Sequence, residues 1–563
     1  MTAALGVDIR NLVQLSCENL RNVLNQIHGD KDLIIDPTLM KPLDTVAGMS
    51  ILKSLGVKKI FKFETKACPS IAYSRVYLLS SSLINAKDVI HHFRDKKTSE
   101  GEFHIIFLPR ILHSIRELFE EEGVYDQIYL HNYMWELIPF DEDLFSLELP
   151  CLFSQVFLNG DSSLLPSVSY SLMSIESLYG KITNKVAIGS HAVNVLKQLD
   201  VISPSTPQTF NSYFEYAFIM DRDIDYVSTL LSPLTYESLL DEVFGINCGS
   251  IELDSRVTTS DKVVKLQLSN KDKTFTKIRN KHIGDIFSYL SVHARQLKQH
   301  QKRAENLSVS EMKNFVQNNL KDIQNQYKAL SLHIGASEVI QKEKGSFFES
   351  MLHIEHGIVR GQCLKEAIQI IEELMAQLCS MDIVIRLMAL ASICHNGFSS
   401  GDYESLRRQF VQAYGFEKMH ILRTLQKRGL VFKKDSNRKH SFQTFATKVN
   451  LIPKSQESVS LTEPSDPSYV FNGAYTPLIS RIVESFMGKG NQTEFMSHLT
   501  HLSTRIQFQN KPNRSKFVLI YFIGGYTLAE VASLKILQTI MGHHFVIAGT
   551  SNTTGKKIME SVL

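Results

Sequence analysis

A short apolar strand that runs directly into charged residues constrains this chain more than any other feature. The segment Ala217–Met220 is fully apolar and is typical of a buried strand. Asp221, Arg222 and Asp223 follow at once, and Asp225 comes two residues later. Carboxylates gathered at a strand end indicate either a metal or acid/base site, or a structural charge network. Because a guanidinium pairs well with carboxylates, the position of Arg222 between two acids favours a structural network of Asp221, Arg222 and Asp223.

The composition bounds the class of protein. The chain has 563 residues, more than one hydrophobic core usually supports, so three or four domains are expected. Hydrophobic residues make up 43% and charged residues 21%, as in globular proteins. A net charge of +3 argues against a general nucleic-acid-binding protein. The seven cysteines include no C-x-x-C pair, which indicates free thiols in a reducing compartment.

The sequence contains no signal for membrane insertion. Met1–Arg10 lacks the basic and apolar regions of a signal peptide, and the C-terminus carries no prenylation box. The longest apolar run is Phe517–Ile523, whereas a membrane span needs about 20 residues. We therefore expect a soluble, cytosolic protein that reaches membranes only through its partners.

Alternating strand and helix patterns predict a parallel α/β sheet in a first domain, residues 1–145. A helical pattern over residues 1–28 precedes it. We expect strands at about 31–37, 59–64, 76–79, 103–108 and 127–130, with helices at 43–56, 86–94 and 112–122.

A second α/β domain is expected to be discontinuous. It contains a helical stretch at 167–179 and the acidic strand at 217–225. Its other strands lie near the C-terminus, at 516–523 and 544–550, with a helix at 527–541 between them. Buried parallel strands rarely stand alone, so residues 146–245 and 471–563 are predicted to form one domain.

The segment between these parts, residues 246–470, is predicted to be a mostly helical insert. Ser308 and Glu311 form a capping box at the start of a long helix. Apolar residues then recur at gaps of three and four as far as Gly345, and a second helical stretch at 349–378 would fold back on the first. The sequence thus predicts a long helical hairpin over about 308–378. A segment poor in apolar residues, 434–470, is predicted to be a loop. The apolar face of the first helix of this predicted hairpin consists of Val316, Leu320, Ile323, Tyr327, Leu330 and Ile334.

Two glycine-bearing segments resemble phosphate loops only in part. Gly524–Gly525 stands between a strand and a helix but lacks the G-x-G-x-x-G spacing, and Thr527 with Glu530 forms a capping box that satisfies the helix end without a ligand. Gly549–Lys557 departs from the Walker A pattern in its glycine spacing and lacks the hydroxyl residue after Lys556. Both segments are therefore interpreted as structural, and no cofactor is expected.

Two further patterns carry weak signals. In His353–His356 two histidines three residues apart flank a glutamate, which does not match a zinc-protease motif, so a solvated helix face is predicted and no metal is expected. A basic run indicates either a surface for phosphates or an acidic helix, or simply a solvated face. Its members are Lys271, Lys273, Lys277, Arg279 and Lys281.

Several long segments, in the same order along nearly the whole chain, resemble the SM (Sec/Munc-type, syntaxin-binding) family. The segment AFIMDRDIDYVSTLLSPLTYESLLDE, which begins at Ala217, is similar to the family's signature strand and helix. FNGAYTPLISRIVE (Phe471–Glu484) and VLIYFIGGYTLAEVASLKIL, which begins at Val518, are similar to its later segments. The segments FLNGD (Phe157–Asp161), LSLHIGASE (Leu330–Glu338) and AYGFEKM, which ends at Met419, resemble the vacuolar-sorting branch of the family.

The resemblance implies a three-domain arch of two parallel-sheet α/β domains and a large helical insert, without catalysis. It implies that syntaxin-type SNARE helices lie in a cleft between the first domain and the insert. It also implies docking on a Vps16-like α-solenoid protein through positions that match the branch, Arg407, Phe416 and Met419. Packing of these side chains in an ordinary core is about as compatible with the sequence.

The expected function is therefore that of a regulator of SNARE assembly, without catalytic residues, which acts peripherally on late endosome, lysosome and recycling endosome membranes. Two alternatives remain open from the sequence. One is an α/β nucleotide-binding enzyme that uses the two glycine-bearing loops, and the other is a scaffold subunit that binds the solenoid protein without binding SNAREs.

Overall fold

The computed structural model describes the chain in two compact units. Unit 1 comprises Met1–Lys181, Asn194–Tyr213 and Ala548–Ser551, and unit 2 comprises Ile182–Val193, Phe214–Ile547 and Asn552–Leu563. The described residues are all except 1–9, 69–71, 96–100, 204–211, 259–261, 305–319, 435–440, 454–463, 489–491, 501 and 509–514.

Unit 1 contains the five-stranded parallel sheet that the sequence predicts, with strand order β2-β1-β3-β4-β5. Strand β1 lies between β2 and β3 and is buried along its whole length, from the charged residues Lys31 and Asp32 through its three apolar residues. Leu33 pairs with Ile60 on one side and Val76 on the other. The strands are β1 (Lys31–Ile35), β2 (Val57–Lys62), β3 (Ser74–Ser80), β4 (Glu102–Leu108) and β5 (Tyr129–His131). The helices are α1 (Arg10–Gln26), η1 (Pro37–Leu39), α2 (Met40–Val46), α3 (Met49–Ser54), α4 (Leu83–Arg94), α5 (His113–Glu121) and η2 (Tyr125–Gln127).

Unit 1 continues beyond residue 145, where the sequence places a domain boundary. The buried indole of Trp135 donates to the carbonyl of Leu147 at 2.9 Å, and the Ser174 hydroxyl donates to Glu136 at 2.9 Å. These bonds connect the end of the first sheet to the helices that follow it. The elements are β6 (Ile138–Pro139), β7 (Leu144–Ser146), α6 (Cys151–Phe153), the π-helical segment η3 (Ser154–Asn159) and α7 (Leu165–Tyr179).

Within unit 2, five strands follow one another in the order β12-β8-β9-β13-β14, so strands from residues 184–221 lie beside strands from residues 504–549. Strands β8, β9 and β13 are parallel, and Ile520 pairs with Phe218, so the late apolar strand joins the acidic strand as predicted. The short edge strand β12 is antiparallel and was not predicted, because its sequence lacks a strong apolar pattern. The bounds are β8 (Asn184–Ile188), β9 (Phe214–Asp221), β12 (Thr504–Gln507), β13 (Phe517–Ile523) and β14 (His544–Gly549).

The following helical elements connect or follow the strands of this sheet along the chain. They are α8 (Ser190–Ile202), η4 (Arg222–Ile224), α9 (Val227–Leu230), α10 (Tyr236–Phe244), η6 (Pro467–Phe471), α20 (Leu478–Met487), α21 (Gln492–His498), α22 (Leu528–Met541) and α23 (Gly555–Glu560).

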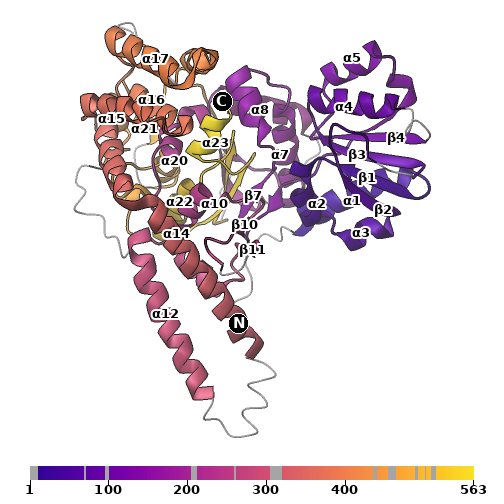
Figure 1. The fold of residues 1–563 in the computed structure, drawn as a ribbon, viewed down its shortest axis with the longest axis horizontal. Coiled ribbons are helices and arrows are strands. Elements are labelled where there is room, and N and C mark those ends of the chain that lie inside the picture. The colour runs from indigo at the N-terminus through magenta and orange to yellow at the C-terminus, as the bar shows by residue number, and fades with distance from the viewer. Residues whose placement is uncertain are drawn as a thin grey trace. The chain divides into compact units, whose positions relative to one another are not determined.

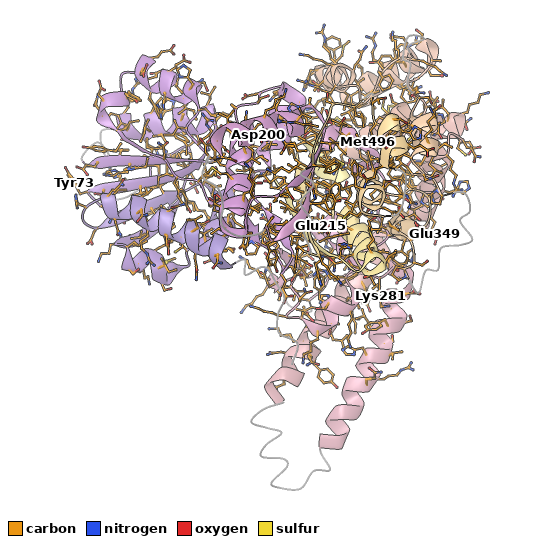
Figure 2. The ribbon with its side chains drawn as sticks, turned by 180° about the vertical axis from the view of Figure 1, so that it is seen from behind. Tyr73, Asp200, Glu215, Lys281, Glu349 and Met496 are labelled. Atoms are coloured by element: carbon orange, nitrogen blue, oxygen red, sulfur yellow. The ribbon has the colours of Figure 1, made fainter. Side chains whose placement is uncertain are left out.

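The predicted insert is mostly helical, but its long hairpin differs from the prediction. Element α14 (Leu320–Val359) consists of two helical segments that meet at a kink at Gly345, whose backbone angles (φ 6°, ψ −162°) are not helical. The helix beside α14 is the preceding α12 (Ile283–Ala304) (Figure 1). Figure 2 shows the same pair from behind, with Lys281 just before α12 and Glu349 on α14. The sequence thus locates the helix break at Gly345 correctly, but the segment after Gly345 does not fold back on the segment before it. The predicted capping box at Ser308 lies outside the described residues.

The remaining elements of the insert are shorter. A two-stranded ribbon, β10 (Ser250–Leu253) and β11 (Val264–Gln267), precedes α11 (Lys273–Ile278). After α14 come α15 (Leu364–Ala376), α16 (Met381–Cys394), α17 (Ser400–Tyr414), η5 (Phe416–Lys418), α18 (Met419–Lys427) and α19 (Phe442–Lys448). Helix α19 lies inside the segment predicted to be a loop. Across the described residues, no helix is both long and apolar enough to cross a membrane.

Candidate functional site

Asp221 ends strand β9 and caps a helix. Its carboxylate accepts hydrogen bonds from the backbone N–H groups of His191 at 2.7 Å and Ala192 at 2.8 Å, in the first turn of α8. A Cβ atom at Gly189 would lie 2.2 Å from this carboxylate, so glycine leaves the necessary room. Burial raises the pKa of Asp221 well above its usual value, and the charge of Asp223 adds to this effect. Asp221 therefore occupies a helix end at which an anion would otherwise bind.

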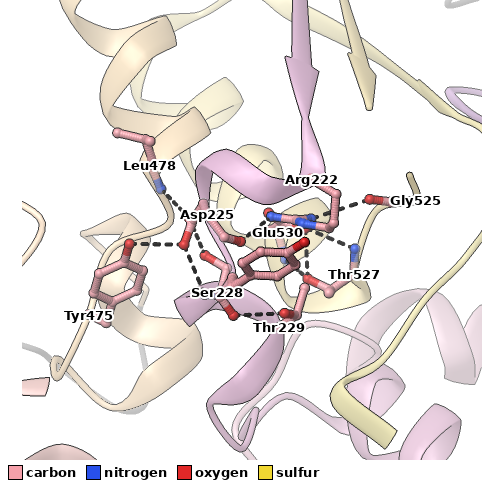
Figure 3. Close-up of polar contacts among 10 residues, drawn as sticks. Arg222, Asp225, Ser228, Thr229, Tyr475, Leu478, Gly525, Thr527 and Glu530 are labelled. Carbon is pink, nitrogen blue, oxygen red and sulfur yellow. Dashed lines mark hydrogen bonds and ion pairs between the residues drawn. The ribbon is translucent and has the colours of Figure 1, made fainter. Parts of the chain in front are cut away.

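Arg222 is fully buried and forms a two-point ion pair with Glu530 (Figure 3). The two Nη atoms of Arg222 donate to the Glu530 carboxylate oxygens at 2.7 and 2.8 Å. They also donate to the carbonyls of Gly525 at 3.3 Å and Asp225 at 2.6 Å. The carboxylate that pairs with Arg222 is thus not one of its sequence neighbours, since Asp221 caps α8 and Asp223 is exposed.

Asp225 joins the β9 strand end to the segment that returns from the insert. Its carboxylate accepts the backbone N–H and the hydroxyl of Ser228, at 3.0 and 2.6 Å. It also accepts the Tyr475 hydroxyl and the backbone N–H of Leu478, both at 3.0 Å (Figure 3). Four donors satisfy one buried carboxylate, so Asp225 has a structural role that connects segments about 250 residues apart in sequence.

The glycine pair before α22 leads into a helix that is capped by its own side chains. Thr527 and Glu530 form the capping box that the sequence predicts. The Thr527 hydroxyl accepts the N–H of Glu530 at 3.1 Å, and the Glu530 carboxylate accepts the N–H of Thr527 at 2.9 Å. The same carboxylate binds Arg222, so the helix end and the buried guanidinium are neutralised by one residue.

In the segment that resembles a Walker A loop, residues 549–557, side chains of the protein again satisfy the helix end and the lysine. Thr554 caps α23, and the Lys557 amine donates to Asp241 at 3.0 Å. Asn552 donates to the other oxygen of Asp241 at 2.7 Å. A cavity of about 20 Å³ between this segment and the start of α22 is large enough for about one water molecule. In the part of the chain that the structure describes, no group of three or more histidine, cysteine or acidic side chains is placed to hold a metal ion.

Glu355 is buried, so the prediction of a solvated helix face at residues 353–356 is wrong at this position. Its side chain is buried and accepts the backbone N–H and hydroxyl of Ser232 at 2.7 and 2.9 Å, and the Arg386 guanidinium at 3.1 Å. Arg386 also bonds the carbonyl of Leu230 at 2.8 Å. Burial lowers the pKa of the adjacent His356 to about 4. Through these bonds, the C-terminal part of α14 is attached to α16 and to the segment after β9.

The basic run divides into paired and exposed residues. Arg279 forms a two-point ion pair with Glu237 at 2.8 Å, and the Lys281 amine lies 5.4 Å from the centre of the Tyr289 ring. Lys273 and Lys277 are exposed on α11. Part of the run is therefore structural, and part is solvated.

Arg407, Phe416 and Met419, which come from three consecutive elements, line one open groove of about 590 Å³. Phe416 is 75% exposed, so it does not belong to the core. On the wall of the groove, Glu404 pairs with Arg407 at 3.0 Å and with Lys433 at 2.6 Å. The groove therefore combines an exposed aromatic ring with cationic side chains. Its other lining residues are Tyr403, Glu417, His420, Leu422, Arg423 and Gln426.

The structure thus brings Arg407, Phe416 and Met419 together. Asp221 and Arg222 have different hydrogen-bond partners, although the charge of Asp223 interacts through space with both Asp221 and Arg222. The residues that sequence reasoning missed are Glu530 as the partner of Arg222, Asp241 as the partner of Lys557, and Glu355. Their pairings span long stretches of sequence, and no local pattern signals them.

The comparisons with known proteins agree with this architecture. The Sec1 family model matches residues 31–561. Vacuolar protein sorting-associated protein 33B of Danio rerio is 31% identical, over 99% of this chain and 97% of the relative.

Solved structures share the fold at low sequence identity. The Unc18–syntaxin 1 complex from Monosiga brevicollis contains a chain that is 17% identical, with a TM-score of 0.60 over 98% of this chain and 99% of the other. The SM protein Vps45, solved in complex with the Qa SNARE Tlg2, is 16% identical, with a TM-score of 0.60 over 98% of this chain and 97% of the other. A family model that covers nearly the whole chain, together with a relative of matching length, establishes that this chain belongs to the Sec1 family, the SM proteins.

Proposed function

We propose that the chain is a regulator of SNARE assembly in vesicle fusion, and that it works without catalysis. The observation that carries this proposal is the family match over residues 31–561. Solved relatives of the same fold are complexes with syntaxin 1 and with the Qa SNARE Tlg2, which supports SNARE helices as the ligands. The side-chain caps at α8, α22 and α23 support a scaffolding role for the glycine-bearing loops.

The proposed mechanism is the alignment of SNARE helices on a preformed helical surface. Helices α12 and α14 lie side by side and offer a long template of the kind on which other helices pack. A template that holds two helices in register removes part of the entropic cost of bringing them together, so assembly becomes faster and more selective. The anchoring of α14 by Glu355 and Arg386 keeps this template in place.

The groove lined by Arg407, Phe416 and Met419 is the proposed docking site for a Vps16-like α-solenoid protein. An exposed aromatic ring beside a methionine and an arginine has the composition of a binding hot spot. A core residue would not leave most of its ring in water. Through this partner, the chain would reach late endosome, lysosome and recycling endosome membranes without binding lipid itself.

The double variant Phe416→Asp with Met419→Asp tests the docking site. We expect it to abolish binding to a purified Vps16-like solenoid protein, because two carboxylates replace the apolar anchors. The circular dichroism spectrum and thermal midpoint should be retained, since Phe416 is exposed. Ile540→Asp, at a side chain of α22 that is 55% exposed, is the matched control and should bind normally. Retained solenoid binding by the double variant, or its global unfolding, would contradict the proposal.

A further inference from the structure

The end of helix α15 places a leucine where a helix normally places glycine. Two backbone bonds, from the N–H of Leu378 to the carbonyl of Met375 at 3.1 Å and from the N–H of Cys379 to the carbonyl of Leu374 at 3.0 Å, form a Schellman motif. This motif requires Leu378 to adopt a left-handed conformation, with φ 53°. A β-carbon makes that conformation unfavourable, so glycine or asparagine is the usual residue.

The chain follows the usual rule at other helix ends. The same pair of backbone bonds recurs where glycine or asparagine holds the left-handed position. These residues are Gly123, Gly361, Gly429, Asn396, Asn450 and Asn472. At Leu378 the chain departs from this rule, and the side chain gains no compensating burial, because it is 66% exposed. Folding therefore gives no reason for a leucine at this position.

Leu378 lies at the same end of the insert as Phe416. Helices α15 and α17 run side by side in the same direction, since Gln409 donates to Glu372 at 2.6 Å and the Tyr414 hydroxyl donates to the carbonyl of Cys379 at 2.7 Å. Each helix is followed at this end by one exposed apolar side chain, Leu378 after α15 and Phe416 after α17.

We propose that Leu378 and Phe416 form one docking edge, which extends the solenoid-binding groove across the α15–α16 turn. This inference rests on the proposed function of the groove. The chemistry of the partner follows from the charges present. Glu404 already pairs with Arg407 and Lys433, whereas Arg423, exposed on the groove wall, has no ion-pair partner among the residues that the structure describes. The occupant is a helix of the solenoid protein whose exposed face is apolar and carries an acidic residue opposite Arg423.

The variant Leu378→Gly separates docking from folding. Glycine relieves the left-handed conformation, so the thermal midpoint should stay unchanged or rise. Loss of the side chain should weaken binding to the purified Vps16-like solenoid protein about tenfold, as expected for an apolar anchor at an interface. Leu378→Asn should behave in the same way, because asparagine also accepts this conformation.

Two further variants, a control and a change of the groove's charge, complete the test. Ile540→Asn, at another exposed apolar position, should leave solenoid binding unchanged. Arg423→Glu should weaken binding, and the loss should shrink at high salt, where the charge pair contributes less. If Phe416→Asp abolishes binding while Leu378→Gly binds as tightly as the wild type, the extended edge is refuted and the groove stands. If the wild-type chain does not bind the solenoid protein, the proposed function of the groove fails, and this inference fails with it.

Discussion

At the scale of single residues, the ion pair between Arg222 and Glu530 is the best test of the buried charge network. Removing one partner leaves an uncompensated buried charge, which costs about 3–5 kcal/mol. We expect Glu530→Leu to lower the midpoint of chemical unfolding strongly, since Glu530 also caps α22. The double variant Arg222→Met with Glu530→Leu should recover part of the loss, because no charge remains buried. Circular dichroism during urea unfolding measures both, and a double variant less stable than the single one would contradict this account.

Because of Glu136, we expect the folding stability of unit 1 to depend on pH. Burial raises its pKa from 4.5 to about 7, against the Ser174 hydrogen bond, which lowers it. The folded state therefore keeps a proton that the unfolded state loses above about pH 4.5. The stability that this proton contributes is fully present below that pH and is lost as the pH rises through about 7.

The variant Glu136→Gln should remove this dependence. Glutamine keeps an oxygen for Ser174 but never becomes charged, so its advantage over the wild type should grow by about 2–3 kcal/mol between pH 5 and pH 8. Thermal midpoints measured at both pH values test this. An advantage that stays constant with pH would show that Glu136 titrates normally.

The sequence predicted side-chain interactions only where the two partners are close together in the chain. Thr527 and Glu530 are three positions apart, and the structure contains the capping box that the sequence predicts for them. The pairing of Arg222 with Glu530 spans 308 residues, so a plausible but different pairing with the adjacent acids was the natural interpretation. Glu355 sits on a helix whose local pattern looks solvent-facing, and only the approach of Arg386 from α16 reveals its burial.

At the scale of elements, the β10–β11 ribbon and helix α14 meet at a glycine. A Cβ atom at Gly335 would lie 2.9 Å from the carbonyl oxygen of Val257, which follows β10, and Arg256 forms an ion pair with Glu343 on α14. The ribbon therefore braces the proposed SNARE template. The close approach depends on the missing side chain, because a backbone oxygen cannot move aside as a flexible side chain can.

We expect Gly335→Ala to push the ribbon away while α14 stays helical, since alanine favours a helix more than glycine does. Amide hydrogen exchange should speed up in residues 250–258 and stay slow at Leu330. Ser331→Ala, at an exposed position of the same helix, is the control. Unchanged exchange in the ribbon would show that the contact does not hold it.

The elements themselves were largely predictable because their apolar patterns are strong. Strands β1, β4, β9 and β13 are apolar along most of their length, and burial on both faces follows from that. The pairing of α14 with α12 was missed because α12 is polar along much of its sequence, and its apolar side meets α14 only in three dimensions. Helix α19 was missed because it is only seven residues long and the rest of the segment 434–470, with three prolines after the helix, has the pattern of a loop.

At the scale of the whole molecule, a chain of the Sec1 family carries glycine-bearing loops whose helix ends are filled by Asp221, Glu530 and Thr554. We expect isothermal titration with ATP and GTP, each with magnesium, to give no binding heat, because the positions that would receive phosphate already hold side chains. Saturable nucleotide binding with turnover would instead support an α/β enzyme.

In the proposed function, helical surfaces rather than a catalytic site do the work. The most direct measurement is the rate of assembly of purified syntaxin-type and partner SNARE motifs, followed by fluorescence energy transfer, with and without the chain and its solenoid partner. We expect faster assembly in the presence of the chain, and loss of the acceleration when the exposed α14 residue Phe347 is changed to aspartate. An assembly rate that the chain does not change, with no SNARE binding at micromolar concentration, would contradict the proposed function.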